Sequence, residues 1–140
     1  MKNYNLDRFI KAQKRDFPLA LEEVRAGRKT SHWIWYIFPQ IQGLGFSSTA
    51  QYYAIENLEE AKAYLADPVL RERLLEISNA LLALDSCDPS EVMGYPDDLK
   101  LRSSMTLFSL AEPECTVFRD VLDKFYGGRE DERTIDLCRI

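Results

Sequence analysis

The sequence has few residues of the kinds that bind metal ions: one histidine and three cysteines among 140 residues. Cys87, Cys115 and Cys138 lie far apart, and no two of them form a CxxC pair. Structural zinc sites use four such ligands at short, regular spacings, so these spacings indicate no metal site. Scattered cysteines in odd number are typical of reduced thiols in a cytoplasmic protein, and we expect neither a metal ion nor a cofactor.

Long hydrophobic runs are also lacking. No apolar stretch approaches the roughly 20 residues that cross a membrane as a helix. The N-terminal residues MKNYNLDRFIKAQKRDF are amphipathic and charged, and they contain no apolar core of a signal peptide. We therefore expect a cytoplasmic protein without a membrane-bound part, folded as a single domain over residues 1–140 and present as a monomer or a weak homo-oligomer.

An excess of positive charge is missing as well, because the formal net charge is −5. A general nucleic-acid binder needs a basic face that releases counterions from phosphate, so the net charge argues against this class of function. The charge is uneven, however: the first 50 residues hold eight basic and four acidic side chains, and the remaining 90 hold ten and nineteen. This asymmetry permits a local positive pocket on an acidic protein.

The caps and the apolar spacing predict helices along the whole chain. A first helix begins near Asn5 as a possible cap, and Pro18 can open a second short helix that Gly27 closes. Further starts are predicted at Asn57 with Glu60, and at residues 67–68, 88–89, 96 and 131. The most regular apolar stripe has steps of four and three residues and consists of Leu70, Leu74, Ile77, Leu81 and Leu84. The prediction is an all-α, single compact domain of about six to eight short helices.

Residues 32–38, HWIWYIF, are the exception because they are rich in residues that favour strands. A lone strand would leave its backbone groups unpaired, and no partner strand is evident elsewhere in the chain. We therefore predict a short buried helix with a cap at Thr30 or Ser31. It ends near Ile37, because Phe38 precedes a proline.

The first candidate site lies in RKTSHWIWYIFPQIQGLG, residues 28–45. Arg28, Lys29, Ser31 and the only histidine, His32, form a run of hydrogen-bond donors typical of an anion site, especially beside the free amides of a helix N-terminus. The rings of Trp33, Trp35 and Tyr36 offer flat faces for stacking. The alternative is structural, since such aromatic clusters usually belong to a core.

The second candidate stretch is DDLKLRSSMTLF, residues 97–108. On a helix, Lys100, Ser103 and Ser104 share one face, and Leu101, Met105 and Phe108 share another. This polar face suits phosphate or carboxylate. Alternatively, the small serines permit close helix packing and bond back to carbonyls of their own helix.

These two stretches, with LDRFIKAQKRDFPLALEEVRAGRK before them and YYAIENLEEAKAYLADPVLRERL between them, resemble the bacterial family known as domain of unknown function 1810. The resemblance runs from about Leu6 to Leu137 and implies a compact helical domain without an assigned activity. Some relatives are described as calpastatin, but that inhibitor is long, repetitive and largely disordered, unlike this chain. The family pattern, carried over by position, includes Gln13, Arg28, Lys29, Ser31, His32, Trp33, Pro39, Gln40, Lys100, Ser103, Ser104 and Thr106.

Our leading hypothesis is that the protein binds, or binds and processes, an anionic small molecule such as a nucleotide or an ADP-ribose-like compound. His32 is then the catalytic candidate, because its ordinary pKa suits proton transfer near neutrality. The binding candidates are Arg28, Lys29, Ser31, Trp33, Trp35, Gln40, Lys100, Ser103 and Ser104. The alternative is a non-enzymatic module for protein–protein interaction or structure, in which the same side chains form a buried polar network.

Overall fold

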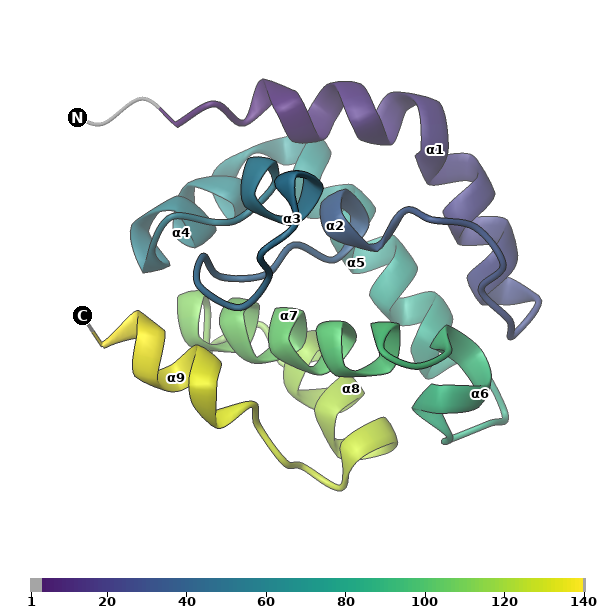
Figure 1. Cartoon of the computed structure of the whole chain (residues 1–140). Helices are drawn as coiled ribbons and strands as arrows, with labels where there is room; N and C mark the ends of the chain where they lie inside the picture. Colours follow the sequence, from purple (N-terminus) through teal and green to yellow (C-terminus); the bar gives the residue numbers. More distant parts are fainter. Residues whose placement is uncertain (1–3, 140) are drawn as a thin grey trace.

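The computed structural model describes residues 4–139, and this part of the chain folds into nine helices (Figure 1). The all-α prediction is confirmed, with slightly more helices than the sequence indicated. Their bounds are α1 Asp7–Arg25, α2 Ile34–Ile37, α3 Ser48–Tyr52, α4 Leu58–Ala66, α5 Pro68–Leu82, α6 Pro89–Met93, α7 Asp97–Ala111, α8 Val117–Tyr126 and α9 Glu132–Cys138. Within the described residues, none of these helices is long and apolar enough to span a membrane.

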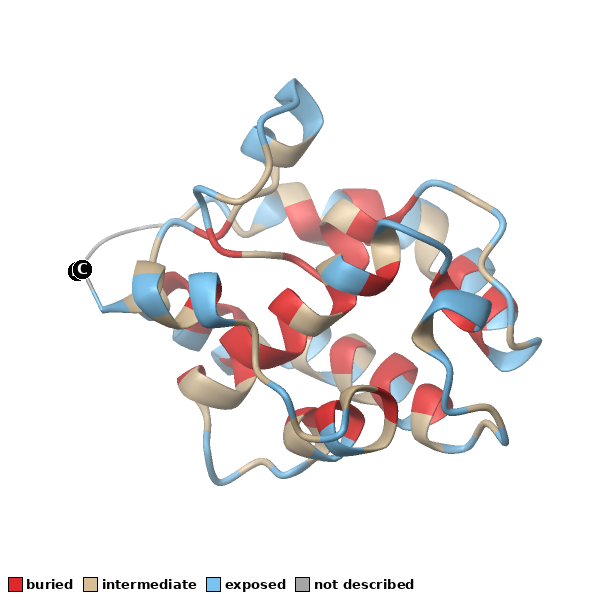
Figure 2. Cartoon of the chain, turned by 60° about the horizontal axis from the view of Figure 1, so that its bottom comes forward, coloured by how far each residue is buried: buried red, intermediate tan, exposed pale blue. Residues whose placement is uncertain are grey.

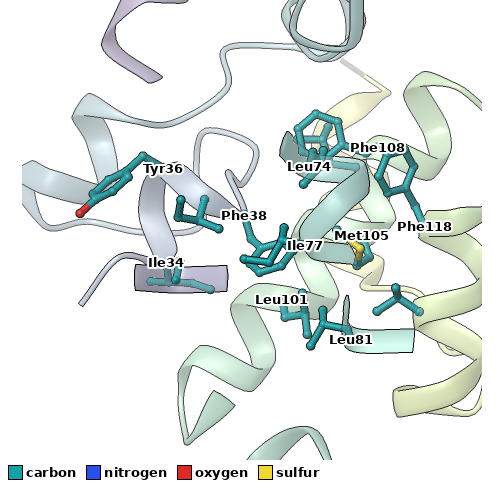
Figure 3. Close-up of a cluster of buried hydrophobic side chains, with 14 of the residues drawn as sticks. Ile34, Tyr36, Phe38, Leu74, Ile77, Leu81, Leu101, Met105, Phe108 and Phe118 are labelled. Carbon is teal, nitrogen blue, oxygen red and sulfur yellow. The ribbon is translucent and has the colours of Figure 1, made fainter. Parts of the chain in front are cut away.

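Helix α7 lies at the centre of the packing, where it contacts α2, α4, α6, α8 and α9. Helices α1 and α5 pack against each other, and α5 also packs on α8. The apolar faces meet in one core (Figure 3), which includes Phe38, Leu74, Ile77, Leu81, Leu101, Met105, Phe108 and Phe118. Buried residues line the inner sides of the helices, and exposed ones face outward (Figure 2).

Helix α1 corrects two predictions at the N-terminus. It is one continuous helix with Pro18 inside it, and not two helices separated at this proline. Proline weakens a helix because it lacks an N–H donor, and α1 bends so that its second half turns away from the first (Figure 1). Burial of Phe9 before Pro18 and of Val24 after it anchors both halves to the core. The predicted cap at Asn5 is also absent: Leu6 occupies the cap position, and no side chain bonds the first amides.

Four other helix starts lie where the sequence predicts them. Asn57, Asp67, Asp88 and Asp131 each accept a hydrogen bond from a backbone amide in the first turn of α4, α5, α6 and α9, respectively. These caps depend only on neighbouring residues, which explains why local sequence predicts them.

Helix α2 is short and buried, as predicted, and it stops at Phe38 before Pro39. Its start differs from the prediction, because Trp33 occupies the cap position and neither Thr30 nor Ser31 caps the helix. The amides of both residues instead donate to the carboxylate of Glu23 on α1. A long-range partner therefore replaces the expected local cap.

Residues 40–56 join α2 to α4 and include the only β-bridge among the described residues. Ile41 and Ile55 lie parallel and buried, with Ile55 N donating to Gln40 O at 2.8 Å and Gln42 N donating to Ile55 O at 2.7 Å. Between them, α3 buries none of its residues.

The cap of α5 yields a first prediction. Asp67 accepts hydrogen bonds from Val69 N at 3.0 Å and Leu70 N at 3.1 Å. Replacing it (Asp67→Ala) leaves these amides without that partner, so we expect a loss of about 1 kcal/mol, within a range of roughly 0.5–2. The melting temperature should fall by about 3–5 °C in a calorimetric scan. Asp85→Ala is the control, since Asp85 is exposed and makes no such bond. Equal melting temperatures for the two variants would contradict this account.

Candidate functional site

The two stretches singled out in the sequence meet in space at Asp97. The carboxylate of Asp97, at the start of α7, lies 2.5 Å from Lys29 Nζ and 3.4 Å from Lys100 Nζ. Lys29 comes from the loop after α1, and its backbone amide donates to Val92 O of α6 at 2.7 Å. One carboxylate thus binds a lysine from each stretch.

Each of these lysines also lies over a tryptophan ring. Lys29 Nζ is 5.0 Å from the centre of the Trp33 ring, and Lys100 Nζ is 5.4 Å from that of Trp35. Such cation–π contacts stabilise by about 0.5–2 kcal/mol, depending on exposure. We call the five residues Trp33, Lys29, Asp97, Lys100 and Trp35 the Asp97 cluster. The Lys29 side chain is only 5% exposed, whereas Lys100 retains 28%.

The carboxylate of Glu23, on the buried side of α1, accepts four hydrogen bonds from the loop between α1 and α2. Its Oε1 accepts hydrogen bonds from Thr30 N at 2.8 Å, Ser31 N at 3.0 Å and Trp33 Nε1 at 3.0 Å, and its Oε2 accepts one from Ser31 Oγ at 2.6 Å. Burial raises the pKa of this carboxyl, but the four hydrogen bonds together outweigh burial and hold its pKa at about 2. Glu23 therefore carries a negative charge within a site predicted to hold anions.

A second polar network anchors α2 to α1 and α4. Gln13 Nε2, almost fully buried, donates to Tyr36 O at 2.7 Å and to Tyr64 Oη at 2.8 Å. The Tyr36 hydroxyl donates to Asp16, which Arg15 binds through two nitrogens at 3.0 Å each. Burial and the bond to Asp16 raise the pKa of Tyr36 to about 12, so this phenol is neutral at physiological pH.

Several predicted binding residues are occupied by contacts within the protein. Ser31 bonds Glu23, and Trp33 is 1% exposed, so its ring faces are covered. Ser103 Oγ donates to Leu99 O of its own helix at 3.1 Å, and Ser104 Oγ is buried without a hydrogen-bond partner among the described residues. In this conformation these four side chains are bonded or covered within the protein and are not open to a ligand.

Other predicted residues remain accessible. Arg28 and His32 are exposed, and no carboxylate among the described residues pairs with either. Trp35 and Gln40 are half-buried and line one small pocket with Tyr53 and its neighbours. In the described part of the chain, no three His, Cys, Asp or Glu side chains lie close enough to hold a metal ion.

An open depression of about 580 Å³ lies beside the Asp97 cluster, between the loop after α1 and α6. Arg28 and Lys29 line one side, and Ser90, Glu91 and Gly94 line the other, with Gly27 between them. Ser90 Oγ donates to the buried Asp98 at 3.0 Å, so its hydroxyl is engaged. Tyr95 follows Gly94 in the chain and is 79% exposed.

The sequence interpretation missed three residues of this region: Glu23, Asp97 and Tyr95. Glu23 lies on the buried side of α1 with no sequence motif around it, and its donors lie seven to ten residues downstream. Asp97 stands in the second candidate stretch but is not among the predicted site residues. A signal for it was available, because Asp97 and Lys100 lie three residues apart at the start of a predicted helix.

Glu23 leads to a prediction about pH. Its folded-state pKa of about 2 is below the ordinary value of 4.5, so its contribution to stability is present above pH 4.5. The contribution, at most about 3 kcal/mol, is lost as pH falls from 4.5 to 2. Glu23→Gln should therefore be less stable than wild type by about 1–3 kcal/mol at pH 7 and nearly equal at pH 2, as measured by denaturant unfolding. A stability difference that does not change with pH would contradict this assignment.

Asp97 leads to a second prediction. Removing its charge (Asp97→Asn) leaves the buried Lys29 ammonium without its anion, so we expect a loss of about 2–4 kcal/mol in denaturant unfolding. Lys100→Met removes the more exposed partner and should cost under about 1 kcal/mol. The double variant Lys29→Met with Asp97→Asn should recover most of the loss. A cost below about 1 kcal/mol for Asp97→Asn alone would show that this ion pair does not hold the loop.

Comparison with known proteins agrees with this helical architecture. The crystal structure of the conserved hypothetical protein Rv1873 from Mycobacterium tuberculosis is 45% identical in sequence, with a TM-score of 0.95 and 98% of each chain covered. None of the curated proteins matches the chain. The family described as "Protein of unknown function (DUF1810)" matches residues 3–138. The chain therefore belongs to the DUF1810 family.

Proposed function

We propose that this protein binds an anionic small molecule at the depression between the loop after α1 and α6. The observation that carries the proposal is the exposed guanidinium of Arg28. It lines the depression and has no carboxylate partner among the described residues. Arginine in this state offers several fixed donors to a phosphate or carboxylate.

The exposed Arg28 guanidinium favours an anion on its side of the depression. Lys29 and Lys100 share the carboxylate of Asp97, and the Glu23 carboxylate behind the loop offsets the charge that remains, so Arg28 is the group that attracts the anion. The other side carries Glu91, and Asp98 lies behind Ser90. An anion should therefore contact the Arg28 side only, and its affinity should fall as salt screens the surface.

A nucleotide or an ADP-ribose-like compound is the most specific form of this proposal. Trp33 cannot stack on a base because it is buried, but the exposed Tyr95 directly follows Gly94, which lines the depression, and offers a ring for stacking. The catalytic role of His32 remains a prediction. Its imidazole is exposed in the same loop, four residues after Arg28, where it can exchange a proton with a ligand that is processed.

A thermal-shift screen tests the binding proposal. Nucleotides, NAD, ADP-ribose, sugar phosphates and small carboxylates are added at millimolar concentration to wild type and to Arg28→Ala. A ligand of the native state raises the melting temperature by mass action, so we expect a rise of a few degrees that Arg28→Ala loses. Arg139→Ala, another exposed arginine, is the control and should keep the rise. No rise with any compound, or an equal rise in Arg28→Ala, would refute the proposal.

The second candidate function is a non-enzymatic protein–protein interaction or structural module. One observation favours it: Lys29 and Lys100 already pair with Asp97, as a structural polar network requires, while Phe46 and Tyr95 expose large apolar surface. The same screen separates the two candidates. The module predicts no thermal shift with any anion, whereas the anion site predicts a shift that depends on Arg28.

A further inference from the structure

The two walls of the depression at Arg28 come from segments of opposite charge. Residues 24–55 include the loop after α1 and contain three basic side chains, Arg25, Arg28 and Lys29, but no Asp or Glu. Residues 74–99 include α6 and contain six acidic side chains but no Lys or Arg. The depression of about 580 Å³ therefore has a basic wall on one side and an acidic wall on the other.

Each wall presents a charge that is open to a ligand. Arg28 and Glu91 both line the depression, and both are exposed. They form no ion pair with each other, and neither pairs with another charged side chain among the described residues. Lys29 also lines the depression, but it already binds Asp97 at 2.5 Å. A ligand in the depression can therefore meet a positive charge on one wall and a negative charge on the other.

A buried carboxylate adds to the acidic wall. Ser90, which lines the depression, donates from its hydroxyl to Asp98 Oδ2 at 3.0 Å. Asp98 is only 7% exposed, and its Oδ1 is buried with no hydrogen-bond partner in the described part of the chain. A carboxylate without a counter-ion makes the potential behind Ser90 more negative, because the protein interior screens charge less than water does.

Backbone contacts fix the two walls relative to each other. Lys29 N donates to Val92 O at 2.7 Å, so the basic loop is bonded to the helix that carries Glu91. Asp88 caps this helix, α6, and Glu23 binds the amides of the loop. Both charges therefore stand on backbone that is ordered before a ligand arrives, which lowers the entropic cost of binding.

Facing walls of opposite charge favour a ligand that carries both charges. A molecule with an anionic group alone is attracted by Arg28 but repelled by Glu91 and by Asp98 behind it. An ammonium group at the other end of the molecule turns this repulsion into attraction. The volume of the depression lies within the range of small-molecule sites, about 300–1,000 Å³.

We propose that the ligand of this depression is a dipolar small molecule, with its phosphate or carboxylate on Arg28 and its ammonium group on Glu91. Amino phosphates and amino acids are the chemical class. This inference rests on the anion site proposed at Arg28 and adds the group that binds the opposite wall.

The test compares probes that differ only in an amine: 2-aminoethylphosphonate with ethylphosphonate, and 4-aminobutylphosphonate with butylphosphonate. Dissociation constants are measured by NMR titration of ¹⁵N-labelled protein, from the amide signals of residues 27–29 and 90–94. In at least one pair we expect the amine to bind at least about threefold tighter, the size of an exposed ion pair. A site for anions alone gives the opposite order, because the ammonium lowers the net negative charge of the probe.

Three variants show which charge is responsible. Glu91→Gln should remove the advantage of the amine, so that the two members of the pair bind within about twofold of each other. Glu72→Gln removes the same charge from an exposed glutamate of α5 outside this lining, and should keep the advantage. Arg28→Ala should weaken the binding of both members.

The outcomes separate the dipolar ligand from the anion site itself. If both members of each pair bind equally and Arg28→Ala loses both, the anion site stands and the dipolar ligand is overturned. An advantage of the amine that Glu91→Gln retains also overturns it. If no probe shifts residues 27–29 or 90–94, the dipolar ligand is overturned, and the thermal-shift screen then decides the anion site alone.

Discussion

The fold of the candidate site depends on the buried carboxylate of Glu23. Placing a charge inside a protein is costly unless hydrogen bonds replace its hydration, and Glu23 receives four of them from Thr30, Ser31 and Trp33. These bonds set the path of the loop after α1, and this path brings Lys29 to Asp97 and the Trp33 ring into the core. The positions of Lys29 and Trp33 in this loop follow from that one anchored charge, while the Gln13 network separately joins α2 to α1 and α4.

The polar residues of the two candidate stretches fall into two groups, according to their burial and pairing. The buried Lys29 and Trp33 side chains and the half-buried Ser31 are engaged by partners within the chain, so their residue types are explained by structure. Arg28 and His32 have no such partner among the described residues, and structural requirements alone do not account for them. Some polar residues of the two candidate stretches therefore support the structure, and others are open to a ligand. Only the burial and pairing of each side chain distinguish these two groups.

The helices were predictable where their signals are local. The caps at Asn57, Asp67, Asp88 and Asp131 involve amides two or three residues away, so the sequence contains both partners side by side. The prediction of a new helix at Pro18 was wrong for the opposite reason. Its local preference is to break a helix, but packing on both sides of it contributes more free energy than the lost hydrogen bond. The start of α2 was missed in the same way, because Glu23 took the amides that a local cap was expected to bind.

By itself the sequence determined the helical class, most helix boundaries, the burial of most of residues 32–38 and the family, because these depend on periodicity, caps and specific motifs along the chain. It also singled out the two stretches that carry the candidate site. Only the tertiary structure decided that these stretches meet at Asp97, that Glu23 lies beneath them, and which of their side chains remain open to a ligand. The physical reason is distance along the chain: Lys29 and Asp97 are 68 residues apart, and no local pattern encodes which carboxylate a buried lysine will reach.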